Sequence, residues 1–201
     1  METIRSYHNK KVNKMKKIKR YIFLTLAVMA VISVFVFVKM YKAIIFPNVL
    51  TPNGEKISLY IYSDDDFEDV KQKLYSDSII INHKSFEWLA KKLDYPKYIK
   101  SGHYVISNNM NNNRLLNMLR SGSQTPVKFT FNNIRTIEQF AGRVAEQLEM
   151  DSVSLVNAVK ESATLKEMGF DDESAASIFI PNTYELYWNI DANDFVEKMV
   201  G

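Results

Sequence analysis

The chain has 201 residues and carries 26 basic against 23 acidic side chains, so its formal net charge of +3 is too small to indicate a domain built to bind a polyanion. It contains no cysteine, which excludes disulfides, thiolate metal sites and cysteine nucleophiles. The three histidines, His8, His83 and His103, show no metal-ligand spacing, and none of the six glycines falls in a Gly-x-Gly pattern. We therefore expect no metal ion and no cofactor.

An uncharged apolar run begins soon after the N-terminus. It extends over 18 residues from Tyr21 to Val38, and at about 1.5 Å per residue a helix of this length crosses most of a hydrocarbon layer about 30 Å thick. A cleaved signal peptide is the alternative, but the run is longer than a usual signal core and no Ala-x-Ala site follows it. We predict a transmembrane anchor over residues 21–42.

Basic residues flank this run unequally. Seven of them lie between residues 10 and 20, whereas only Lys39 and Lys42 follow the run closely. The positive-inside rule therefore places the tail, residues 1–20, in the cytoplasm and the chain from Pro47 onward outside it. Because the basic tail adjoins a membrane helix, we expect anionic lipid rather than nucleic acid as its neighbour.

The next stretch predicts a small α+β module over residues 47–131. Pro47, Pro52 and Gly54 indicate a linker over residues 46–55, and period-two alternation predicts strands over 57–62, 101–106 and 127–131. Three helices with apolar stripes lie between the strands. The first is expected to begin after the acidic residues 64–66 and the second at Ser85. The third is expected to begin at Asn112 or Asn113 and to end before Gly122. The strand–helix–helix–strand part resembles a LysM domain, a fold often used to hold the N-acetyl sugars of cell-wall glycan.

Residues 132–201 read as a second, mainly helical region. Thr136–Leu148 has a clear apolar stripe, and Thr136 with Gln139 predicts a capping box. Asp151 is expected to cap a helix that turns Val153, Leu155, Val156 and Val159 toward a core. An acidic patch over 171–173 reads as a solvated loop, and a last helix is expected from about Asp191, with Phe195, Val196 and Met199 on one face.

Ser177–Trp188 is the stretch with chemical potential, because it is rich in aromatic residues and holds a single charge, Glu185. Aromatic faces can stack on sugar rings, and an amide such as that of Asn182 can bond to hydroxyls. A carboxyl group buried among aromatic rings tends to stay protonated and can then act as an acid. The alternative is that the aromatic residues are core and Glu185 is a surface charge.

The segment Phe179-Ile-Pro-Asn-Thr-Tyr-Glu185 is similar to the Phe-x-Pro-Asp/Asn-Thr-Tyr signature of the YceG-like endolytic murein transglycosylases, the MltG family. Weaker matches are Gly102-x-Tyr104, the Leu119–Gly122 segment, and strand 127–131 before Arg135-Thr136-Ile137. The resemblance covers residues 47–201. It implies a LysM-like subdomain over 47–131 and the N-terminal part of a mixed α/β catalytic domain over 132–201, and it implies that the family pattern continues beyond Gly201.

The family's activity would make this chain an inner-membrane lyase of cell-wall biogenesis. Such enzymes cut nascent glycan between N-acetylmuramic acid and N-acetylglucosamine, leave a 1,6-anhydro end and so terminate strand elongation. The resemblance implies peptidoglycan strands, the membrane and cell-wall synthases as partners. It also implies that the substrate lies against the motif residues, which are Asn182, Thr183, Tyr184, Tyr187 and Trp188.

One position departs from the family pattern. Members carry the catalytic glutamate five residues before the motif proline, and here that position is Ala176. The nearest carboxylates are Glu173 and Glu185, and we predict Glu185 as the acid because it lies within the aromatic motif. A catalytically silent peptidoglycan-binding or scaffold protein is the alternative function, and an unrelated anchored receptor domain is a third.

Overall fold

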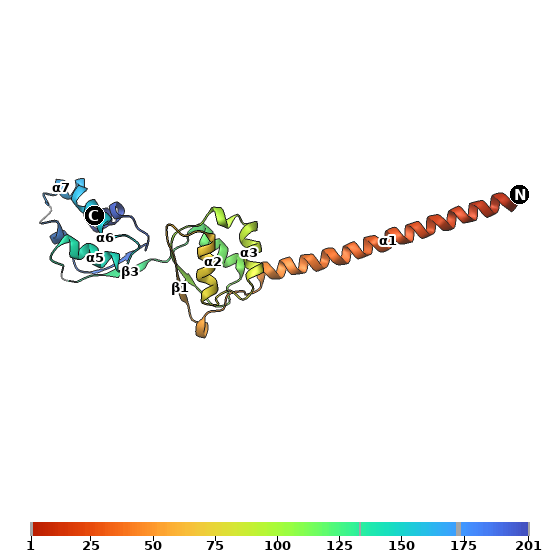
Figure 1. Ribbon diagram of the computed structural model, residues 1–201, viewed down its shortest axis with the longest axis horizontal. Helices are drawn as coiled ribbons and strands as arrows, with labels where there is room; N and C mark the ends of the chain where they lie inside the picture. The colour runs from red at the N-terminus through yellow and green to blue at the C-terminus, as the bar shows by residue number, and fades with distance from the viewer. Residues whose placement is uncertain (1, 133, 172–173, 201) are drawn as a thin grey trace. The chain divides into compact units, whose positions relative to one another are not determined.

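The computed structural model describes residues 2–132, 134–171 and 174–200, and the chain divides into two units, residues 1–46 and 47–201. The first unit consists of helix α1, Glu2–Ile45 (Figure 1). Within it, Lys19–Ile45 has a mean hydropathy of 2.7 and is long and apolar enough to cross a membrane. The Thr25 hydroxyl donates to the Ile22 carbonyl at 2.8 Å, so this polar group is satisfied inside the helix, as a bilayer requires.

The second unit begins with a small α+β arrangement. Strands β1 (Ile57–Ile61) and β2 (Gly102–Ile106) pair antiparallel, with Leu59 opposite Tyr104. Helices α2 (Phe67–Ser76) and α3 (His83–Lys92) lie between them in sequence, and α4 (Asn112–Ser121) follows β2 (Figure 1). Short 3-10 turns occupy Pro52–Gly54 and Tyr95–Lys97. The fold class is α+β, as the sequence predicts.

Side-chain caps set where these helices begin. Asp66 caps α2 in a capping box with Asp69, as expected from the acidic run. The predicted starts of the next two helices were wrong: Asn82 caps α3 by accepting from the Ser85 amide, and Asn111 caps α4. In both cases an asparagine earlier in the chain supplies the side-chain oxygen that the third helical amide needs.

Asp66 gives a pH-dependent prediction. Backbone amides of Asp69 and Glu68 donate to its carboxylate and lower the pKa of Asp66. Because the folded pKa is depressed, the cap stabilises the fold above the ordinary carboxyl pKa and is lost as pH falls through the lowered value. We expect Asp66→Asn, which caps without titrating, to flatten the acid limb of the thermal unfolding midpoint between about pH 7 and about pH 3. An acid limb as steep as that of the wild type would contradict this.

The segment after α1 is part of the second unit and is not the linker that its prolines predict. Val49 is fully buried, and isolated bridges join Pro47 to Asn111 and Val49 to Ile80. Buried Asn48 donates to the Asn112 Oδ1 at 2.7 Å and accepts the backbone N–H of Asn82 at 2.8 Å. The Asn112 Nδ2 donates to the Ser85 Oγ at 3.0 Å, so this segment is tied to both α3 and α4.

Asn112 is the centre of that network, and its side chain is fully buried. We expect Asn112→Ala to lower the free energy of unfolding by about 1–3 kcal/mol, because it removes two buried hydrogen bonds, the one that Asn112 accepts from Asn48 and the one that it donates to the Ser85 hydroxyl. Asn117→Ala, an exposed change on the same helix, should stay within about 0.5 kcal/mol. Chemical unfolding of the full chain in detergent measures both changes. Equal effects of the two would show that the hydrogen-bond network around Asn112 does not stabilise the fold.

The rest of the second unit has its own strand pair and core. Its elements are β3 (Val127–Thr130), α5 (Ile137–Ala145), α6 (Ser152–Glu161), α7 (Ala163–Glu167), a 3-10 turn (Ala175–Ile178), β4 (Thr183–Leu186) and α8 (Ala192–Val200). β3 pairs antiparallel with β4 and not with β1 or β2, although its sequence was assigned to the first module. The reason is burial: Phe129 and Phe131 pack with Phe140 in the core of this second part.

Most helices of this part match their predicted faces. Thr136 caps α5 and Asp151 caps α6, and Phe195 and Val196 of α8 are buried. Two details were wrong. The Gln139 side chain accepts from the Arg135 amide and so forms no capping box with Thr136, and Val153 is 66% exposed. Of the expected acidic loop, residues 172 and 173 lie outside the described residues.

Candidate functional site

The aromatic motif is an irregular segment that leads into β4. Phe179 is buried and its ring stacks on Phe140 with centroids 4.4 Å apart. The Tyr184 hydroxyl donates to the Ile180 carbonyl at 2.8 Å, which closes the loop around Pro181. The motif is therefore held at its first residue by the core and at its tyrosine by its own backbone.

One face of the β3–β4 pair turns toward solvent. Thr183 and Glu185 are exposed on β4, and their ladder partners on β3 are Thr130 and Lys128. The two threonine hydroxyls lie 2.9 Å apart. Asn182 precedes this face, is exposed, and accepts the Thr183 amide on its side-chain oxygen at 2.8 Å. The result is a polar ledge of Thr130, Lys128, Asn182, Thr183 and Glu185, which we call the β4 ledge.

Glu185 does not sit among aromatic rings. Successive residues of a strand point to opposite faces, so Tyr184 and Leu186 turn inward while the Glu185 side chain is exposed. Lys128 lies directly opposite in the ladder, and the Lys198 Nζ donates to the Glu185 backbone carbonyl at 3.2 Å. The expectation of a desolvated acid is therefore wrong for the described chain. What the geometry offers is a carboxylate open to a ligand laid across the ledge.

The position at which the family pattern has its glutamate carries no carboxylate here. Ala176, at the usual glutamate position, lies in the 3-10 turn and packs half-buried against the core. Glu173 lies outside the described residues. Among the residues that the structure does describe, no cluster of histidine, aspartate and glutamate is arranged to hold a metal ion.

The aromatic residues predicted to bind substrate divide into two groups. Tyr187 is 54% exposed, so its ring is available to a ligand. Trp188 is only 6% exposed and packs edge-on against Tyr60 and Tyr62 of the β1 segment, with centroids 5.0 and 4.8 Å away. Tyr184 is half-buried and stacks on Phe131. Of the three, Tyr187 alone offers an open face beside the β4 ledge.

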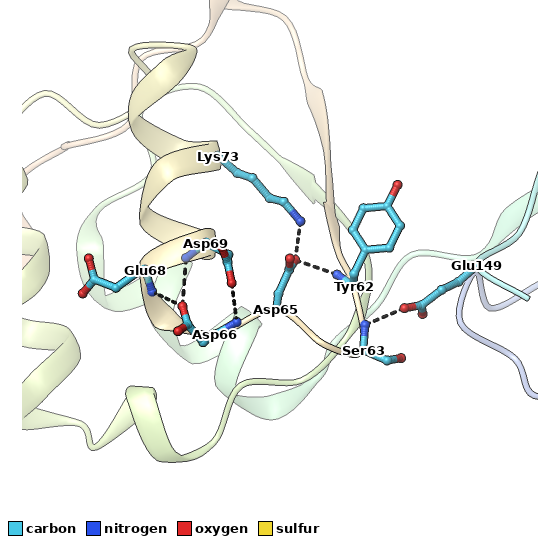
Figure 2. Close-up of polar contacts among 8 residues, drawn as sticks. All are labelled: Tyr62, Ser63, Asp65, Asp66, Glu68, Asp69, Lys73 and Glu149. Carbon is cyan, nitrogen blue, oxygen red and sulfur yellow. Dashed lines mark hydrogen bonds and ion pairs between the residues drawn. The ribbon is translucent and has the colours of Figure 1, made fainter.

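Trp188 belongs to a seam between the two parts of the second unit. Glu149 accepts the Ser63 amide on its Oε1 at 2.5 Å, as Figure 2 shows. Asp65 accepts the Tyr62 amide and pairs with Lys73, which fixes the same turn. Asn189 donates to the Ser101 Oγ at 2.8 Å. The contacts that Glu149, Trp188 and Asn189 make across the seam have no sequence signal, because their partners are far apart in the chain.

A concave feature lies beside the 3-10 turn Ala175–Ile178. It is a hollow of about 420 Å³ with an apolar lining from α6, α7 and the turn, and with two lysines and one aspartate; its residues are Val159, Lys160, Leu165, Lys166, Phe170, Asp171 and Ala175. It contains no residue of the β4 ledge. It therefore does not add a chemical group to that site.

Comparison with known proteins adds a family match. A model of the YceG-like family matches residues 59–201. A solved YceG-like protein from Listeria monocytogenes is similar at 20% identity over 73% of this chain and 53% of that one, with a TM-score of 0.45. The chain thus spans about half the length of that protein. A search of the curated proteins found no match.

Proposed function

Because the chain belongs to the YceG-like family, we propose that it is a membrane-anchored lytic transglycosylase that cuts peptidoglycan strands, with Glu185 as the proton donor. The observation that carries the proposal is the family match over residues 59–201, which includes the whole aromatic motif. The apolar helix Lys19–Ile45 supports anchoring at the membrane where such strands are made. The basic tail favours a cytoplasmic N-terminus and an extracytoplasmic second unit.

The proposed reaction needs one carboxyl group. A protonated Glu185 donates its proton to the oxygen that links N-acetylmuramic acid to N-acetylglucosamine, and the bond from that oxygen to the anomeric carbon breaks. The 6-hydroxyl of the same muramic acid residue then bonds to the anomeric carbon and returns its proton to the carboxylate. Water is not consumed, so the second carboxylate that hydrolytic glycosidases use is not required.

The β4 ledge supplies suitable groups for holding a sugar near Glu185. Thr183, Thr130 and the amide of Asn182 can bond to hydroxyl or acetamido groups, and exposed Tyr187 can stack on a pyranose ring. A strand of glycan laid on the ledge would exclude water from the carboxyl group. That desolvation would favour the protonated form of a carboxyl group.

A second function is favoured by two observations. Ala176 cannot transfer a proton, and Glu185 is exposed in the free chain. Both fit a protein that binds peptidoglycan within a wall-synthesis complex, with the LysM-like subdomain as the expected sugar holder, and does not cut it.

One assay separates the two functions. The full chain, in detergent, is incubated with uncrosslinked glycan strands, and the products are analysed by mass spectrometry for 1,6-anhydro ends. New anhydro ends support the lyase. Co-sedimentation with insoluble peptidoglycan but no new ends supports the binding protein, and the absence of both contradicts the proposed substrate.

A further inference from the structure

Two large apolar side chains flank the Val49–Ile80 bridge of the second unit and are exposed. Leu50 is 55% and Ile81 62% exposed, and each lies next to a buried neighbour, Val49 or Ile80, that faces the core. The Leu50 amide donates to the Ile79 carbonyl at 2.8 Å, and the Ile81 amide donates to the Asn48 carbonyl at 2.9 Å. In this antiparallel register Leu50 and Ile81 are diagonal neighbours on one face of the pair, and the other two residues of that face, Asn48 and Ile79, are buried.

The backbone that carries this pair is fixed on its other side as well. The amides of Asn48 and Val49 donate to the Met110 carbonyl, and the Asn109 amide donates to the Val49 carbonyl. Leu50 therefore cannot turn inward without breaking the ladder. The exposure of the pair is built into the fold.

Chain connectivity limits the distance between Leu50 and the end of α1. Only Phe46 separates Ile45, the last residue of α1, from the bridge at Pro47. Leu50 follows Ile45 by five positions, so an extended chain lets it lie at most about 18 Å away. The apolar stretch Lys19–Ile45 is 27 residues long. At about 1.5 Å per residue it exceeds a hydrocarbon core about 30 Å thick, so its last residues reach the interfacial layer.

We propose that Leu50 and Ile81 insert into the interfacial layer of the membrane that α1 spans and so dock the second unit on the lipid surface. Lys84 is exposed in the first turn of α3, three residues after Ile81, and supplies a positive charge for anionic headgroups. Lipid fits better than a protein partner, because two side chains are far too small a patch for a stable interface, which buries about 800 Å² on each side. The proposal rests on the membrane anchoring that is part of the proposed function. It depends neither on the proposed substrate nor on which side of the membrane the second unit faces.

The absence of cysteine makes single-cysteine labelling of the full chain direct. Ile81→Cys, Val153→Cys and Val31→Cys proteins are labelled with an environment-sensitive fluorophore in vesicles of phosphatidylethanolamine and phosphatidylglycerol. Nitroxide lipid is the quencher. Val153 is an exposed apolar control at 66%, and Val31 of α1 reports on anchoring. We expect the Ile81 label to be quenched several-fold more than the Val153 label.

Equal quenching at positions 81 and 153 with a quenched Val31 label overturns docking and leaves anchoring intact. An unquenched Val31 label overturns both. A second measurement separates lipid contact from simple tethering. A Lys84→Cys label is compared with and without the Leu50→Ser and Ile81→Ser changes. Its quenching should fall to the level of the Val153 label when both apolar side chains are removed, and unchanged quenching would overturn the proposal.

Discussion

Glu185→Gln is expected to reduce the rate of anhydro-end formation by about 100-fold or more, the range in which positioned acid–base groups contribute. The change keeps the shape and hydrogen-bonding capacity of the side chain but removes the proton that the glycosidic oxygen must receive. Because Glu185 is exposed on β4 and its backbone carries the ladder, the fold should be unaffected. Product formation by mass spectrometry over time measures the effect.

The matched control is Glu167→Gln, which removes an exposed carboxylate of α7. It should leave both the rate and the binding of peptidoglycan unchanged. A binding assay also separates the two roles that Glu185 can have. If Glu185 only donates a proton, the glutamine variant should retain glycan at close to the wild-type level. If Glu185 binds the substrate, the variant should retain less glycan. Turnover of Glu185→Gln at the wild-type rate would remove Glu185 from the chemistry.

Local signals predicted much of the fold. The alternation of buried Leu59 and Ile61 located β1, and side-chain caps at Asp66, Thr136 and Asp151 located three helix starts. Such signals lie within a few residues of the feature that they specify. The partner of a strand has no such signal, so the sequence assigns β3 to the first module although it pairs with β4.

The candidate site was harder to predict for the same physical reason. The aromatic composition of the motif is visible in the sequence. Whether Glu185 faces the core or the solvent depends on its position in a strand, and the sequence analysis predicts no strand at β4. Shifting a residue by one position in a strand reverses its face. The sequence does not predict Lys128 and Thr130 as part of the β4 ledge, because their partners on β4 are more than fifty residues away in the chain.

The largest stability effect is expected at Phe140, which is fully buried in α5. Its ring meets four others, with centroid distances of 4.4 Å to Phe179, 4.8 Å to Phe131, 5.8 Å to Phe195 and 6.2 Å to Phe129. These rings come from α8, from the β3 segment and from the start of the motif. We expect Phe140→Ala to lower the free energy of unfolding by about 3–5 kcal/mol, through lost burial and the cavity left behind.

The same change tests whether the core positions the site. Phe179 is the first residue of the motif and stacks on Phe140, so the turn before β4 loses its anchor when the ring is removed. Chemical unfolding of the full chain in detergent gives the stability. Exposed Val153→Ala should stay within about 0.5 kcal/mol of the wild type. A loss below about 1 kcal/mol for Phe140→Ala would mean that the neighbouring rings close the cavity, and the motif would then be held chiefly by the Tyr184 bond to the Ile180 carbonyl and by the β3–β4 ladder.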